Sequence, residues 1–156
     1  MSHNICKSRQ GILELPMQYV IAVIVAGIAI FLMSAATYNL WKEHEMKKAV
    51  REVKQIVNEA ELMYLTGEEG TRITIDVNLP NSVKRVVFGS SDENLANHYY
   101  ILMRWGANKS FFAEHVKFKG KEDAKAILHG GSSRIVLEIE RVNGESEKYV
   151  KIYLSQ

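Results

Sequence analysis

At 156 residues, the chain is long enough for one small domain with an attached segment, or for one small domain alone. The formal net charge is +2, and Lys7 and Arg9 account for it, because the residues after them hold equal numbers of basic and acidic side chains. This balance excludes the strongly basic class of nucleic-acid-binding domains, so no nucleic acid partner is predicted. Cys6 is the only cysteine, which excludes an intramolecular disulfide.

A long apolar segment follows these first charged residues. No Asp, Glu, Lys or Arg occurs in residues 15–40, and roughly 20 apolar residues in a helix cross the hydrocarbon core of a bilayer. The sequence therefore predicts a helix of membrane length. Two general explanations fit it: a secretory signal peptide cut near Ser34-Ala35-Ala36, or a signal anchor that keeps the basic residues in the cytoplasm.

Glu14 is the single charged residue between Arg9 and Lys42. A charged side chain at the centre of a membrane helix costs about 2.5–3.5 kcal/mol on insertion scales, and less near the interface. A carboxylate at this place therefore indicates either a partner for its charge or a side chain that reaches back to the interface.

The segment Lys7-Ser8-Arg9-Gln10-Gly11-Ile12-Leu13-Glu14 resembles the class III signal peptide of archaeal type IV pilin-like proteins. In that family a short basic leader ends just before a Gln, and a Glu follows four residues later. Many members carry Gly at the last leader position, where this chain has Arg9. The resemblance implies that a prepilin peptidase cuts between Arg9 and Gln10. Residues 1–9 would then be a leader peptide, and Glu14 would be the fifth residue of the mature chain.

The same resemblance implies a function and a location. The precursor would lie in the cytoplasmic membrane as a single-pass protein with its N-terminus inside. The mature chain would polymerise through its apolar helix, residues 10–40, into an extracellular filament on the cell surface. Its partners would be copies of itself or related pilins. Glu14 would pair with the new N-terminal amine of a neighbouring helix, and this pairing would offset the cost of removing both charges from water.

The helix is predicted to continue beyond the apolar segment. Residues 41–67 contain no Gly or Pro before Gly67, and apolar residues recur at three- and four-residue spacing, the pattern of a helix with one apolar face. We expect one helix over residues 12–66, roughly 80 Å long at 1.5 Å per residue. The apolar face consists of Met46, Ala49, Val50, Val53, Ile56, Val57, Ala60 and Met63, widened near the end by Leu62, Tyr64 and Leu65.

Charge is ordered along the same stretch of helix. The charged residues of 42–54 are mostly basic, and those of 59–69 are all acidic. The ordinary explanation is a solvated helix face. The alternative is that the two zones of neighbouring subunits face each other in a staggered filament.

Residues 68–156 are predicted to form a β-rich head. Alternation with a period of two begins after Gly70, and turn residues separate short segments rich in β-formers. Residues 89–97 are predicted to be a polar loop without helix or strand, and residues 121–129 a short helix or a strand. About six or seven strands suit a twisted antiparallel sheet or a small sandwich packed on the helix stripe. The main predicted strands are 71–79, 83–88, 98–105, 111–118, 135–140 and 149–154, with a hairpin turn at Asn143-Gly144.

The chain lacks the sequence motifs of common metal, thiol, hydrolase and phosphate-binding sites. His98, His115 and His129 could converge in the head, but their spacing matches no known ligand pattern, so neither a metal nor a cofactor is predicted. Glu138 and Glu140 share one face of a strand and are expected to be solvated rather than catalytic. The protein is therefore not expected to be an enzyme.

Asn108-Lys109-Ser110 is an acceptor sequence for N-linked glycosylation and lies in a predicted turn. Archaeal pilin-like proteins are frequently glycosylated, so the resemblance favours a glycan at Asn108. Several aromatic residues of the head are expected to lie in the core or in subunit contacts, or alternatively to form an exposed adhesive patch. They are Tyr99, Tyr100, Trp105, Phe111 and Phe112.

These observations predict an α+β protein. A long N-terminal helix, first membrane-spanning and then amphipathic, would carry a small antiparallel β-sheet or β-sandwich head over residues 68–156. The preferred function is a structural subunit of a type IV pilus-like filament. The alternative, from a different class, is a membrane-anchored β-rich extracytoplasmic domain that binds a partner or ligand and does not polymerise.

Overall fold

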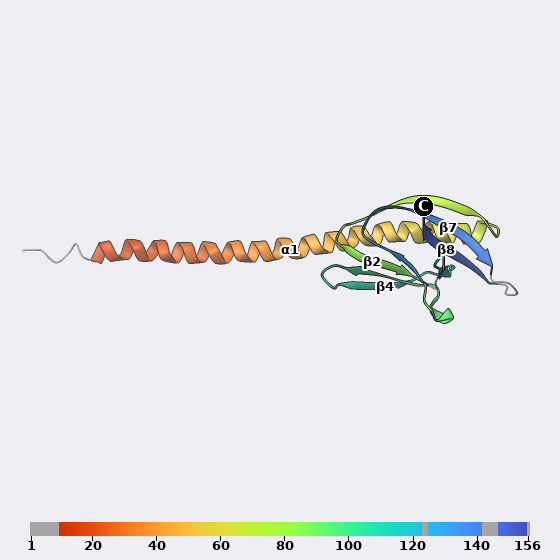
Figure 1. Cartoon of the computed structure of the whole chain (residues 1–156). Coiled ribbons are helices and arrows are strands. Elements are labelled where there is room, and N and C mark those ends of the chain that lie inside the picture. The colour runs from red at the N-terminus through yellow and green to blue at the C-terminus, as the bar shows by residue number, and fades with distance from the viewer. Residues whose placement is uncertain (1–9, 123–124, 142–146, 156) are drawn as a thin grey trace, which may run out of the picture. The chain divides into compact units, whose positions relative to one another are not determined.

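The computed structural model describes residues 10–122, 125–141 and 147–155, and of residues 10–16 and Glu93 it describes the backbone only. Over these ranges the chain forms one α-helix, eight strands and one 3-10 turn, which confirms the α+β class (Figure 1). The chain divides into two compact units, Met1–Glu43 and His44–Gln156. The leader predicted over residues 1–9 lies outside the described residues.

Helix α1 extends over Gln10–Thr66, close to the predicted 12–66. Its last turn ends where Gly67 donates its backbone N–H to the carbonyl of Met63 at 2.7 Å, and the Lys148 ammonium lies 3.3 Å from the Gly67 carbonyl. A cation at this end also complements the partial negative charge of the helix C-terminus. The helix thus stops at the glycine that marked its end in the sequence.

The predicted apolar face of α1 is confirmed for its main stripe. All eight stripe residues from Met46 to Met63 are buried except Val50, which is half-buried. Leu62 and Leu65, which we expected to widen this face, are instead exposed. They lie on the opposite side of the helix, because steps of 100° per residue turn both away from the buried stripe.

The strands of the second unit form two four-stranded sheets. One has the order β1-β7-β8-β5 and the other the order β4-β3-β2-β6. All neighbouring pairs are antiparallel except β5 and β8, which run parallel. The strands are β1 Arg72–Leu79, β2 Val83–Phe88, β3 His98–Met103, β4 Asn108–Phe112, β5 Phe118–Lys119, β6 Ala126–Leu128, β7 Gly131–Arg141 and β8 Lys148–Leu154.

A single hydrophobic cluster joins the α1 stripe to the inward residues of both sheets. Phe88 and Phe118 lie at its centre with ring centroids 5.3 Å apart, and Tyr99 stacks on Phe88 at 5.8 Å. Fully buried Ile56 and Val53 come from the helix. The amphipathic helix and the two sheets each have one apolar face, and packing these faces together removes all of them from water in one core.

Several predictions for the head need correction. Residues 89–97 contain the 3-10 turn η1, Glu93–Leu95, which we did not expect. Strand β3 ends at Met103 instead of residue 105, because Gly106, with φ +89°, donates its N–H to the Met103 carbonyl and turns the chain. Residues 126–128 of the ambiguous segment form a strand. The Asn143-Gly144 turn lies outside the described residues, although β7 and β8 do pair as predicted.

Residues 111–118 do not form the continuous strand that we predicted. Strand β4 ends at Phe112, and the next backbone N–H, that of Ala113, donates to Asn97. The chain then crosses to the other sheet, where Phe118 of β5 pairs in parallel with Val150 of β8. Phe111 before this crossing packs against the core, and Val116 within it and Phe118 after it are buried, so the run resembled one strand in the sequence.

Candidate functional site: the apolar half of helix α1

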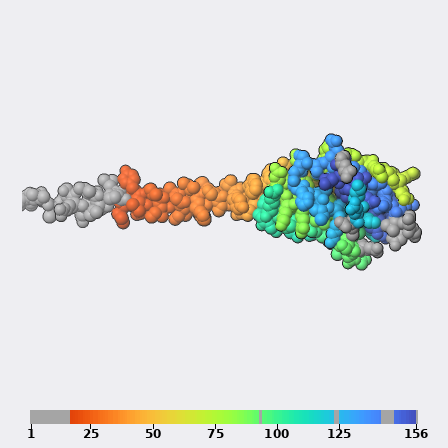
Figure 2. Space-filling model, in the orientation of Figure 1, coloured from red at the N-terminus to blue at the C-terminus, as the bar shows by residue number. Residues whose placement is uncertain are grey.

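The described side chains of the N-terminal unit, from Met17 onward, are almost all exposed (Figure 2). Phe31, for example, is 72% exposed, and Ile, Val, Leu and Met residues surround the helix on every side. By length and composition this helix could cross a membrane, a property that it shares with signal sequences. A helix that is apolar all round must be buried in lipid or among other helices.

The hydroxyl groups in this segment bond to the helix itself. Ser34 Oγ donates to the carbonyl of Ile30, and Thr37 Oγ1 donates to the carbonyl of Met33, both at 2.9 Å. In an apolar environment an unpaired hydroxyl costs free energy, and a bond to the preceding turn avoids this cost. These two polar residues are therefore compatible with burial in lipid or in a helix bundle.

The apolar segment ends in an aromatic and basic cluster of Tyr38, Trp41 and Lys42. The rings of Tyr38 and Trp41 stack with their centroids 6.1 Å apart, and Lys42 Nζ lies 4.2 Å from the centre of the Tyr38 ring. Trp, Tyr and Lys are the residues that anchor helices at the polar boundary of a membrane. Sequence reasoning missed this cluster, although the aromatic residues just before Lys42, the first Lys after the apolar segment, were visible.

Gly27 lies in the middle of the apolar segment. A Cβ atom built at this position meets no heavy atom within 4 Å, so nothing in the structure requires glycine here. Small residues in membrane helices allow a neighbouring helix to approach closely. The position is suited to helix–helix contact.

The residues that carry the pilin resemblance lie at the edge of what the structure describes. Arg9 is outside the described residues, and Gln10 is the first residue of α1. Glu14 lies in the helix, where only its backbone is described. Its pairing with a neighbouring amine stays a prediction.

Asn108 is the first residue of strand β4, at the edge of its sheet, and is not in the turn where we placed it. Its side chain is exposed, and its backbone is in register with Leu102 of β3. The acceptor sequence is therefore accessible to a modifying enzyme.

The three histidines of the head have different neighbours. His98 contacts the ring of Phe112 with centroids 5.0 Å apart, His129 Nδ1 lies 3.1 Å from the Lys84 carbonyl, and His115 Nε2 is 3.8 Å from Glu114. Among the residues that the structure describes, no group of three His, Cys, Asp or Glu side chains is arranged to hold a metal ion.

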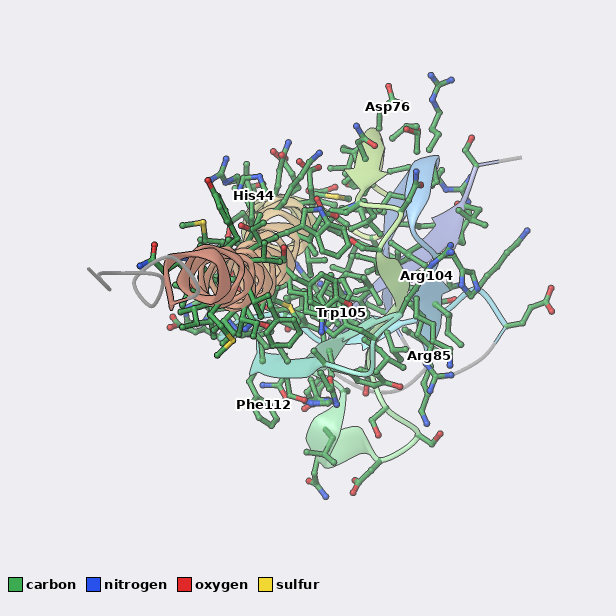
Figure 3. All side chains as sticks on the ribbon, turned by 90° about the vertical axis from the view of Figure 1, so that its left-hand side faces the viewer. His44, Asp76, Arg85, Arg104, Trp105 and Phe112 are labelled. Carbon is green, nitrogen blue, oxygen red and sulfur yellow. The ribbon has the colours of Figure 1, made fainter. Side chains whose placement is uncertain are left out.

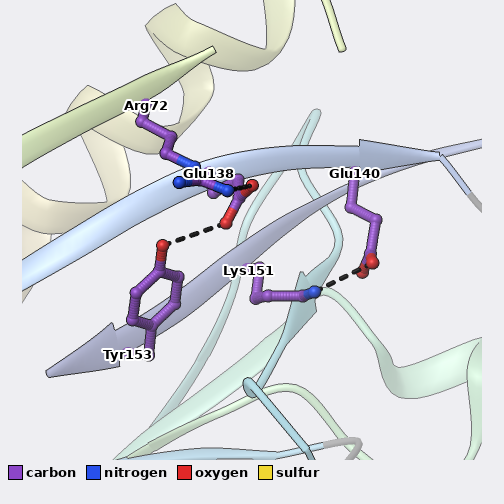
Figure 4. A network of polar contacts seen from close by, with 5 residues as sticks. All are labelled: Arg72, Glu138, Glu140, Lys151 and Tyr153. Carbon is purple, nitrogen blue, oxygen red and sulfur yellow. Dashed lines mark hydrogen bonds and ion pairs between the residues drawn. The ribbon is translucent and has the colours of Figure 1, made fainter. Parts of the chain in front are cut away.

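Glu138 and Glu140 lie on one face of β7 and both bond to other side chains (Figure 4). Our expectation that they would be solvated was wrong for Glu138, whereas the Glu140 side chain is 37% exposed. Glu138, only 15% exposed, accepts from Arg72 at 2.6 Å and from Tyr153 at 3.0 Å. Glu140 accepts from Lys151 at 2.8 Å. Burial alone would raise the pKa of Glu138, but the hydrogen bonds from Arg72 and Tyr153 outweigh it, and the pKa lies below its usual value.

Comparison with known proteins adds no relative to this description. No family model, curated protein or solved structure matches the chain. The apolar helix, its polar boundary and the surface of the head are therefore the features from which function is inferred.

Proposed function

We propose that this chain is a structural subunit of an extracellular type IV pilus-like filament of the archaeal class. The observation that carries the proposal is helix α1 itself: its first half exposes apolar side chains on every side, and its second half supplies the core stripe of a folded head. Such a helix fits a subunit that is held first by lipid and later by the helices of its neighbours. The leader-like sequence before Gln10 supports the same function.

Membrane insertion of the helix would come first, and its transfer into a helix bundle second. The basic residues Lys7 and Arg9 favour an N-terminus that stays in the cytoplasm, with the head outside. Burying a large apolar side chain gains about 1.5–3 kcal/mol relative to water, in lipid or against another helix. Moving the helix from the bilayer into a helical bundle therefore exchanges one apolar environment for another, and extraction need not be prohibitive.

Cleavage between Arg9 and Gln10 would create an α-amino group four residues before Glu14. These two groups lie on roughly the same face of a helix. In a bundle of mature chains, the carboxylate of one copy pairs with the amine of another, and the pair fixes the axial stagger of neighbouring helices. This role would explain why a charged residue is kept next to an apolar segment.

The mature filament is proposed to carry an N-linked glycan at Asn108, because the acceptor residue is exposed on an edge strand. The Asn108→Gln variant should lose the mass of the glycan in protein isolated from the native cell. If the wild-type protein already has the mass of the chain without a glycan, this part of the proposal is contradicted. The filament itself does not depend on it.

Mass spectrometry of the protein isolated from its own cells tests the main proposal. The expected mature N-terminus is Gln10, and electron microscopy of the same preparation should show fibres that contain the chain. Retention of residues 1–9 would overturn the proposal and favour a membrane-anchored domain that does not polymerise. A mature N-terminus close to Ala36 would instead identify a secretory signal peptide and would overturn it as well.

A further inference from the structure

The outward faces of the two sheets differ in chemistry. On the β1-β7-β8-β5 sheet, polar side chains of neighbouring strands bond to one another: Arg134 to Asp76 at 2.8 Å, and Ser132 to Asn78 at 3.1 Å. The Glu138 network continues this pattern. This face is a polar surface of the usual kind for an antiparallel sheet with one side in water.

The outward face of the β4-β3-β2-β6 sheet is apolar and aromatic. Because Tyr99 and Ile101 of β3 are buried in the core, the alternate residues His98 and Tyr100 face outward, and β4 places Phe112 in register with His98. The His98 ring lies 5.0 Å from Phe112 and 5.9 Å from Tyr100. Phe112 is 60% exposed, and Ile127 of β6 is 47% exposed.

Charge on this sheet has one sign. Its four strands contain Lys84, Arg85 and Lys109 but no Asp or Glu. Arg85 is in register with outward Leu102 and lies on this outward face, whereas Lys109 is opposite buried Ile101 and lies on the other side. Figure 3 shows Arg85 and Phe112 projecting on the same side of the sheet, away from the core. We call this surface the aromatic face. An exposed apolar surface with cations around it marks an interaction site for a partner that is apolar and acidic.

The chain itself contains a surface of the complementary kind, at the end of α1. Leu62 and Leu65 are 58% and 66% exposed there. The charged residues beside them along the chain are acidic, because the sequence contains no Lys or Arg between Lys54 and Arg72, although the Lys148 ammonium of β8 lies 3.3 Å from the Gly67 carbonyl at this end. We call this surface the acidic helix end. Its carboxylates are Glu59, Glu61, Glu68 and Glu69.

We propose that the aromatic face of one copy docks on the acidic helix end of a second copy. Apolar side chains would meet at the centre of the contact, and Arg85 would approach the carboxylates at its rim. Two aromatic faces cannot pair equally well with each other, because their cations would then repel. The contact is therefore heterologous: each copy offers one surface and receives the other, so the contact can repeat from copy to copy without closing.

The proposed contact uses only residues of the unit His44–Gln156, so it goes beyond the filament proposal and does not depend on the apolar helix. A glycan at Asn108 would lie on the same outward face and crowd the Arg85 side of the contact, because Asn108 and Arg85 both pair with Leu102 of β3. Asn108 lies four residues from Phe112 along β4, a separation of about 13 Å in an extended strand. The Phe112 end of the aromatic face would stay open to a partner.

Cysteine cross-linking of the full chain in detergent micelles tests this contact. In a Cys6→Ser background, Ser110→Cys marks the aromatic face and Thr66→Cys marks the acidic helix end; both residues are exposed. Mixing the two variants should give more mixed disulfide dimer than either variant gives alone. The matched control mixes Thr66→Cys with Thr74→Cys, an exposed position on the other sheet, and should give only background.

Charge reversal provides the second arm of the test. Replacing Arg85 with Glu in the Ser110→Cys chain, or Glu68 and Glu69 with Lys in the Thr66→Cys chain, should lower the mixed product roughly tenfold, as expected for a few rim ion pairs. Combining both reversals should restore it. Phe112→Ala should also lower the yield, while circular dichroism confirms that the variants stay folded.

Three outcomes would overturn the proposal. Mixed product at the level of the Thr74→Cys control would mean that the aromatic face serves a partner other than this chain. A dominant Ser110→Cys homodimer would indicate pairing between two aromatic faces. A mixed product that is insensitive to the charge reversals would indicate contact without the proposed complementarity.

Discussion

Arg72 and Glu138 are register partners in the β1–β7 ladder, and their side chains form an ion pair with 2.6 Å between Nη2 and Oε1. Tyr153 from β8 donates to the other carboxylate oxygen at 3.0 Å. Three strands of one sheet are thereby joined on their outward face. Burial and the bond to Glu138 also raise the pKa of Tyr153.

This network predicts how the stability of the head depends on pH. The pKa of Glu138 in the folded protein lies below the value of 4.5 for the free side chain. The ionised carboxylate therefore contributes stability above about pH 4.5, and this contribution disappears as the pH falls through the lower pKa of the folded state. Glu138→Gln should lower the free energy of unfolding at pH 7 by about 1 kcal/mol and should flatten its decline in acid.

Chemical denaturation between pH 7 and pH 3 measures this effect, with Tyr153→Phe as an intermediate case. Removing the tyrosine hydroxyl takes away one of the two bonds and should reduce the pH dependence only in part. An unchanged decline in the Glu138→Gln variant would show that the network does not control acid stability.

The two faces of α1 in the head predict different costs for the same chemical change. Ile56 is 1% exposed in the core, so Ile56→Ala should destabilise the head by about 2–5 kcal/mol. Leu62→Ala, on the exposed side of the helix, should change the free energy of unfolding by less than about 0.5 kcal/mol. Thermal unfolding of both variants gives the comparison, and similar losses at the two positions would contradict the observed packing.

The contrast between Ile56 and Leu62 also shows what the sequence could predict. The spacing of apolar residues identified the buried stripe, because a helix repeats every 3.6 residues and one face must meet the core. The same periodicity turns Leu62 and Leu65 away from the stripe, so their assignment to this face was an error that the sequence itself could have corrected.

A strand could be predicted from the sequence where its own residues alternate between apolar and polar. Alternation in β1 and in residues 135–140 of β7 predicted their inward sides. The change of sheet after Phe112 carries no such signal, because the apolar and aromatic residues on both sides of it look alike. The parallel pairing of Phe118 with Val150 likewise depends on segments that lie far apart in the sequence.

The candidate site was predictable in kind, since charge and hydropathy alone distinguish the apolar segment. The aromatic face was anticipated only as the alternative of an exposed aromatic patch, and its members were not, since Tyr99 is buried, Trp105 and Phe111 pack against the core, and Phe112 is exposed. Its members are set only when β3, β4 and β6 come into register. Net charge did not indicate the aromatic face either, because the head is nearly neutral overall although one of its sheets carries only cations on its strands.

Gly130 is predicted to be required by backbone packing. A Cβ atom at this position would lie 2.5 Å from the Val83 carbonyl oxygen and 2.7 Å from that of Pro80, so main-chain atoms would have to move. Gly130→Ala should destabilise the head by about 1–3 kcal/mol. Gly27→Ala is the matched control, because open space surrounds Gly27 and the melting temperature of the head should not change. Equal stability of Gly130→Ala and the wild type would contradict the close approach.

Glu14→Gln tests the role proposed for the first charged residue of the mature helix. Glutamine keeps the size of the side chain and removes its charge, so membrane insertion should be unchanged or slightly easier. Pairing with the N-terminal amine of a neighbour would be lost, and one amine per contact would then be buried without a counter-charge. Leaving one partner of a buried ion pair alone costs about 3–5 kcal/mol, so assembly should fall by far more than tenfold.

The amount of chain in purified fibres, relative to the amount in membranes, measures the outcome. Gln18→Ala is the matched control, since Gln18 is a neutral polar residue one turn further along the same helix. Normal fibre yield with Glu14→Gln would refute the pairing role while leaving the filament proposal intact. Loss of membrane insertion in this variant would instead assign Glu14 to targeting, because the uncharged helix is the more apolar of the two and should enter lipid at least as well.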